Sequence, residues 1–166
     1  MLSEKRNIKA EKQKRLLNKM PVEQLFETER DLIIETNIIK RVSERWHCEY
    51  EKMPQSYAID FALKRHYGGK SKLWAFAEIR TKNHKFGDFP DVFCNLKKLN
   101  QANQFRDEGF DTFFIVKWEC GTIGFTRLNN PDKVEMGGRA TENCRNPEDR
   151  EPLGHWMVQR FEEIMF

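Results

Sequence analysis

Two acidic residues stand alone in apolar stretches of the sequence. Asp60 lies within Tyr57–Ala62 and Glu78 within Leu73–Lys82, and both stretches are rich in the aromatic, β-branched and small residues typical of strands. Taking one carboxylate out of water is costly, and two that face each other repel unless a cation lies between them. The pair therefore indicates a site for a hard cation such as Mg²⁺.

Two basic residues follow Glu78 at a spacing of two. Side chains alternate between the faces of a strand, so Arg80 and Lys82 are predicted to share the face of Glu78. A third acid, Glu35, interrupts the apolar stripe of a predicted helix. It either joins the site or reaches water at the edge of the stripe.

The two apolar stretches are predicted to form a β-hairpin. The segment Lys64–Lys70 between them holds Gly68 and Gly69, a strong turn signal. A strict two-residue turn would pair Tyr67 with Lys70, which puts Asp60 and Glu78 on opposite faces. The metal site therefore requires an odd-length loop or a β-bulge in the hairpin.

The remaining elements predict an α/β (α+β) protein with a mixed central β-sheet flanked by helices. A helix after Glu78 can serve as the right-handed crossover between two parallel strands. The expected elements are a helix over 22–46, an edge strand over 48–53, a helix over 91–108 capped by Asp91 and ended by Gly109, a buried strand over 112–118, its partner over 122–126, a short strand around Val134 in an irregular segment 129–152, a strand over 153–158 and a helical turn over 159–164.

The charge of the chain is uneven along its length. The 166 residues carry a net charge of +3, but the segment from Glu4 to Lys19 holds seven basic and two acidic residues. We expect residues 1–20 to form a basic helix or arm and residues 21–166 to form a single domain. The arm either contacts phosphates or is only a solvated extension.

Several classes of protein are disfavoured. The four cysteines form no C-x-x-C pair and the four histidines show no zinc-ligand spacing, so a zinc site or a disulfide framework is not expected. The sequence has no apolar run of membrane-spanning length, and its beginning is too polar for a secretory signal. We expect a cytoplasmic protein that does not bind membranes.

The order of elements resembles the PD-(D/E)XK nuclease superfamily, with a helix bearing Glu, a strand with Asp, a strand with Glu-x-Lys, a helix and a strand. Three further features are similar to small nuclease-like proteins encoded by bacteriophages, and the resemblance covers about residues 25–160. These features are the run Ala77–Asn83 with Phe89-Pro90, the segment Asn95–Leu99, and the tail Gly137-Gly138-Arg139 … Asp149–Pro152. The resemblance implies a restriction-endonuclease-like core.

The resemblance also implies roles for single residues. Asp60 and Glu78 would bind Mg²⁺, for which Mn²⁺ can substitute, and the backbone carbonyl of Ile79 would assist them. Glu35 would correspond to an acid on the first helix of the family. Lys98 would match a lysine on the helix that follows the active-site strands.

One position departs from the family pattern. Arg80 stands where the motif has lysine, and arginine cannot give up its proton near neutral pH. Lys82, two residues on and on the same predicted face, is the candidate to compensate.

Three functions remain open. The first is a Mg²⁺-dependent DNA endonuclease or exonuclease of phage DNA metabolism that cuts without sequence specificity. Such an enzyme would act as a homodimer if it cuts both strands. The second is a catalytically inactive nuclease-like fold that binds DNA or protein. The third is a structural or partner-binding phage protein with no nucleic-acid role, in which Asp60 and Glu78 form ion pairs with Arg80, Lys82 or Lys64.

Overall fold

The computed structural model describes residues 28–138 and 150–166. They belong to two compact units, one that ends at Leu32 and one that runs from Ile33 to Phe166. The expected basic arm, residues 1–20, lies outside the described residues, as does part of the tail motif. In the described part, no helix combines the length and the apolar character needed to cross a membrane.

The helix predicted to end at Trp46 is α2 (Glu29–Trp46). Thr28 and Asp31 cap its start reciprocally. Thr28 Oγ1 accepts from the backbone N–H of Asp31 at 3.2 Å, and Asp31 Oδ2 accepts from the backbone N–H of Thr28 at 3.1 Å. The predicted apolar face is confirmed further along, where Ile39 and Val42 are fully buried.

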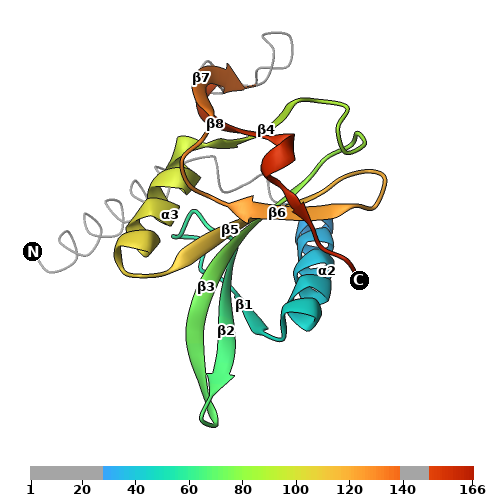
Figure 1. Cartoon of the computed structure of the whole chain (residues 1–166). Helices are drawn as coiled ribbons and strands as arrows, with labels where there is room; N and C mark the ends of the chain where they lie inside the picture. Colours follow the sequence, from blue (N-terminus) through green and yellow to red (C-terminus); the bar gives the residue numbers. More distant parts are fainter. Residues whose placement is uncertain (1–27, 139–149) are drawn as a thin grey trace, which may run out of the picture. The chain divides into compact units, whose positions relative to one another are not determined.

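The predicted mixed sheet is confirmed, and it holds the strands that carry the two acids (Figure 1). β3 and β5 are parallel neighbours, whereas the other adjacent pairs are antiparallel. Between β3 and β5 the chain passes through the helix α3 (Leu96–Asp107), as a crossover connection requires. In spatial order the strands are β1 (Glu49–Lys52), β2 (Phe61–Tyr67), β3 (Lys70–Thr81), β5 (Asp111–Lys117), β6 (Ile123–Arg127) and β9 (Glu162–Glu163).

A second sheet, which the sequence did not predict, consists of β4 (Asp91–Asn95), β8 (Arg150–Met157) and β7 (Lys133–Gly138). The prediction that Asp91 caps a helix is therefore wrong. Residues 91–95 form a strand paired with β8, and α3 starts at Leu96 with Asn95 as its N-cap. The strand that pairs with β4 comes from the far end of the chain, so local sequence gives no sign of it.

The β2–β3 hairpin has a strict two-residue turn and not an odd-length loop. Strand pairing continues to Tyr67 and Lys70, so only Gly68 and Gly69 form the turn. Their φ angles of 57° and 76° are those of a tight turn whose strands follow the natural twist. The first strand also starts later than expected, at Phe61, so that Asp60 directly precedes it.

A β-bulge in this hairpin supplies the register that the metal site requires. Lys64 pairs with Leu73 but Leu63 pairs with Ala75, so Trp74 is an extra residue in β3. Beyond the bulge the paired positions bring Asp60 opposite Glu78. The bulge also places Trp74 on the face of Ala75 and Ala77, opposite to that of Phe76.

The main sheet is covered on both faces. On one face, Ile38, Ile39 and Val42 of α2 pack against the strands. On the other face, Leu99 of α3 and Trp156 of β8 pack around Phe76 and Phe114. Glu78 alternates with Ala77 and Ile79, so it points to the face covered by α3. At the end of the chain, a short 3-10 helix η4 (Val158–Arg160) and the strand β9 replace the predicted helical turn.

Candidate active site

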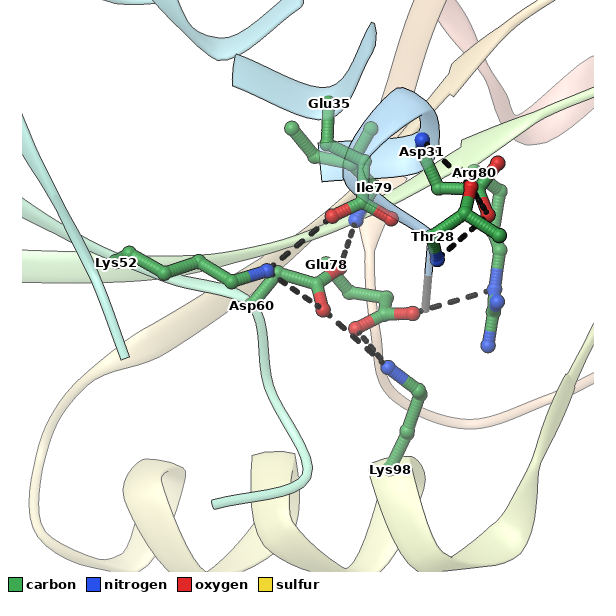
Figure 2. A network of polar contacts seen from close by, with 9 residues as sticks. All are labelled: Thr28, Asp31, Glu35, Lys52, Asp60, Glu78, Ile79, Arg80 and Lys98. Atoms are coloured by element: carbon green, nitrogen blue, oxygen red, sulfur yellow. Dashed lines mark hydrogen bonds and ion pairs between the residues drawn. The ribbon is translucent and has the colours of Figure 1, made fainter. Parts of the chain in front are cut away.

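Asp60 and Glu78 lie side by side at the centre of a polar network (Figure 2). The side chain of Glu78 is 0% exposed and that of Asp60 is 14% exposed. Asp60 Oδ2 accepts a hydrogen bond of 2.9 Å from the backbone N–H of Ile79. This bond fixes the Asp60 carboxylate beside the strand position that follows Glu78.

The ammonium group of Lys98 contacts both carboxylates. Lys98 Nζ lies 2.6 Å from Glu78 Oε2 and 3.6 Å from Asp60 Oδ1. Its backbone N–H donates to the side chain of the cap residue Asn95 at 3.1 Å, so the start of α3 holds Lys98 in place. A single positive charge therefore lies between the two acids.

A second lysine extends the network to Glu35. Lys52 Nζ lies 3.2 Å from Glu35 Oε2 and 3.9 Å from Asp60 Oδ1. The side chain of Glu35 is mostly buried, and Lys52 links it to Asp60. The sequence analysis missed Lys52, because only the pairing of Lys52 with Phe61 places it beside Asp60.

The two basic residues after Glu78 have different positions. Arg80 Nε lies 3.2 Å from Glu78 Oε1. Lys82 Nζ instead lies over the ring of Phe93, 4.4 Å from its centroid. Within residues 28–138 and 150–166, no hydrogen bond or ion pair joins Lys82 to either acid. The structure therefore brings together Asp60, Glu78, Glu35, Arg80 and Lys98, and leaves Lys82 on the adjacent aromatic ring.

The electrostatics differ between the two acids. Burial, reinforced by the Asp60 carboxylate, raises the pKa of Glu78 to about 8. Burial alone would also raise the pKa of Asp60, but Lys98 and the N–H of Ile79 lower it below its ordinary value. Asp60 is thus the ionised acid, and Glu78 gains a proton readily.

The basic groups remain charged. Burial opposes the charge on Lys98, but Glu78 and Asp60 raise its pKa above the ordinary value. Glu78 likewise outweighs burial at Arg80 and raises the pKa of the guanidinium. Lys82 differs, because burial and the nearby Arg80 both lower its pKa.

The donor set fits a hard divalent cation. Glu78 Oε1 is buried and accepts no hydrogen bond in the described part of the chain, where its neighbour is the ion-pair partner Arg80 Nε at 3.2 Å. Lys98 shows that one cation can contact both carboxylates. The backbone carbonyl of Ile79 belongs at the same edge of β3 as its N–H, which faces Asp60. No cluster of three or more His, Cys, Asp or Glu suited to a metal occurs among the described residues, so two carboxylates would carry the site. Mg²⁺ is often held in this way, with water and substrate phosphate completing its ligands.

The family model described as "Phage putative PDDEXK endonuclease" matches residues 22–164. The chain belongs to this family. Together with the mixed sheet, membership establishes the restriction-endonuclease-like fold class that the sequence predicted. On the sequence-based assignment, the acids of the PDDEXK pattern would be Asp60 and Glu78, and Arg80 would stand at the lysine position.

A solved structure with some similarity is that of Hjc, a Holliday junction resolvase from the archaeal hyperthermophile Archaeoglobus fulgidus. The likeness has 16% sequence identity and a TM-score of 0.35, and covers 67% of this chain and 82% of that chain. A likeness of this size does not extend the activity of the resolvase to this PDDEXK protein. No curated protein matches the sequence.

Proposed function

We propose that this PDDEXK protein is a Mg²⁺-dependent deoxyribonuclease. The observation that carries the proposal is the position of Lys98 Nζ, 2.6 Å and 3.6 Å from oxygens of Glu78 and Asp60. Two acids that converge on one cation, next to further fixed positive charge, form a site in which a divalent ion and a phosphodiester could meet. When bound, Mg²⁺ supplies Lewis-acid polarisation of the phosphate and activation of water.

The residues of the chain have separate roles in this proposal. Asp60 and Glu78 hold the ion, with Ile79 contributing its carbonyl and aligning Asp60 through its N–H. Lys52, held by Glu35, keeps positive charge beside Asp60 and so favours its ionised form. These contacts prepare the site for a cation before the substrate arrives.

The two cations nearest Glu78 act on the phosphate. Arg80 stays protonated, so it stabilises the negative charge that develops on the phosphate but takes up no proton. With a cation held by Asp60 and Glu78, Lys98 would remain beside the site, where its ammonium group could contact the phosphate or the attacking water. Lys98 would then take the role that the family motif gives to the lysine replaced here by Arg80.

The proposed substrate is DNA, bound through its phosphates without sequence specificity. Family membership supports DNA as the substrate, and contacts of lysine and arginine with phosphates do not depend on sequence. Cutting both strands needs two sites, for which we propose a homodimer on the DNA.

A plasmid-nicking assay tests the proposal. The parent protein should nick supercoiled DNA in Mg²⁺ or Mn²⁺ but not in EDTA. Asp60→Asn and Glu78→Gln should each slow nicking by more than about 100-fold. Glu51→Gln is the matched control, because it removes an exposed carboxylate from β1 that pairs with Lys64 outside the site.

Two results would contradict the proposal. Nicking by Glu78→Gln at the parental rate would show that the acids do not form the active site. A folded parent that binds DNA but is inert in both metals would establish the inactive binding protein instead. In that case, activity gained by Arg80→Lys would show that the arginine had removed catalysis.

A further inference from the structure

The outer half of the β2–β3 hairpin extends beyond the rest of the sheet. β1 pairs with β2 only as far as Lys64, and β5 pairs with β3 only from Ala75 onward. From Arg65 to Trp74 the two strands therefore pair only with each other in the sheet (Figure 1). Residues 65–74, here called the ribbon, are exposed from His66 to Leu73.

One face of the ribbon is already neutralised. His66 Nε2 lies 2.9 Å from Glu49 Oε1, and Ser71 donates to Glu49 Oε2 at 2.9 Å. Lys64, at the base of this face, forms an ion pair with Glu51. Glutamates of β1 thus satisfy the polar groups on this side.

The opposite face carries positive charge that has no acidic partner in the described part of the chain. Pairing of Tyr67 with Lys70 and of Arg65 with Lys72 places these four side chains together. Arg65 anchors the base, stacked 3.5 Å above the Trp74 ring and donating to the carbonyl of Trp46 at 3.2 Å. Tyr67, Lys70 and Lys72 have no hydrogen-bond or ion-pair partner in the part of the chain that the structure describes.

We propose that this face of the ribbon is a second DNA-binding site, which contacts duplex DNA away from the cleavage centre through Lys70, Lys72 and Tyr67. A two-stranded ribbon fits the major groove of DNA, and two lysines beside an exposed aromatic ring complement a polyanion. The absence of acidic residues from 65–74 favours this partner over a basic or neutral surface. The inference rests on the proposed function, since it takes DNA as the substrate.

The spacing along β3 gives the reach of this site. Lys70 lies eight residues before Glu78 on β3, about 26 Å along an extended strand. That distance corresponds to about eight base pairs of B-form DNA. Lys70 and Lys72 share the face of Trp74, which is opposite to the face of Glu78, so the ribbon would hold the duplex away from the scissile phosphate without reading the cut site.

Fluorescence anisotropy with a labelled DNA duplex tests the proposal. The duplex has about 30 base pairs, which is long enough to span both sites. The buffer contains EDTA, which stops metal-dependent cleavage. Lys70→Ala/Lys72→Ala should weaken binding and reduce the slope of log K against log salt by about 0.9 for each lysine. Lys70→Glu/Lys72→Glu should weaken binding further. Lys64→Ala removes one lysine from the neutralised face and should change neither quantity.

The outcomes separate this proposal from the proposed function. If the parent binds and nicks DNA while Lys70→Ala/Lys72→Ala binds as tightly and with the same salt slope, the ribbon proposal is overturned and the nuclease stands. If the parent binds no DNA, both are overturned. If the double variant changes from dimer to monomer in size-exclusion chromatography, the ribbon is a contact between two copies and not a DNA site.

Discussion

At the scale of single residues, the protonation of Glu78 governs how stability depends on pH. The pKa of this buried acid is raised from 4.5 to about 8. Between these values the folded protein holds a proton that the unfolded chain has released, so the free energy of unfolding falls as pH rises through the window. The slope can reach about 1.4 kcal/mol per pH unit.

Replacing Glu78 by glutamine removes this titration. In metal-free buffer we expect the melting temperature of Glu78→Gln to exceed that of the parent, by a margin that grows from pH 5 to pH 8. Thermal unfolding by circular dichroism at several pH values measures the margin. Melting curves that stay parallel across the window would show that Glu78 is ionised in the folded protein.

Lys98 and Lys82 should contribute unequally to catalysis. Lys98 contacts both acids, whereas Lys82 lies over Phe93. We therefore expect Lys98→Ala to slow plasmid nicking by about 100-fold or more, and Lys82→Ala to have a much smaller effect. Equal losses in the two folded variants would instead support the sequence-based hypothesis that Lys82 replaces the lysine of the motif.

At the scale of secondary-structure elements, the cap of α3 links stability to the site. Asn95 accepts from the N–H of Lys98 at 3.1 Å, so the same cap starts the helix and positions the catalytic candidate. Asn95→Ala should lower the free energy of unfolding by about 1 kcal/mol and also slow nicking. Asn95→Ser, which keeps a capping oxygen, should restore both.

The control for this prediction is the other helix cap. Thr28→Ala removes a comparable cap from α2 without touching Lys98. It should lower stability and leave nicking unchanged. Loss of nicking in Thr28→Ala and Asn95→Ala alike would mean that activity only follows stability.

The elements near the acids were largely predictable because their signals are local. The double glycine marked the hairpin, the apolar run marked β5, and Gly109 marked the end of α3. The site demanded a bulge, but nothing in the sequence located it at Trp74. β4 was mistaken for the start of a helix because its partner β8 is distant in sequence. Lys52 was missed because only the pairing of β1 with β2 places it beside Asp60.

At the scale of the whole molecule, the charge distribution predicts which segment would contact the proposed DNA substrate. Residues 4–19 carry a net charge of +5, which exceeds the +3 of the whole chain, and their role is still a prediction from sequence. Deleting residues 1–20 should weaken binding to all DNA sequences alike and reduce the salt slope by about 0.9 per lost phosphate contact. Fluorescence anisotropy at several salt concentrations measures this slope, and an unchanged value would show that the segment is a solvated extension.

The central claim is that Asp60 and Glu78 form a cation site in which Lys98 stands in for the metal ion. Crystals soaked in Mn²⁺ and measured near the manganese absorption edge test it most directly. We predict an anomalous peak between the two carboxylates, with the ammonium of Lys98 moved away from its bridging position. An empty map with Lys98 still bridging Glu78 and Asp60 would contradict the claim and identify the acids as structural ion-pair partners.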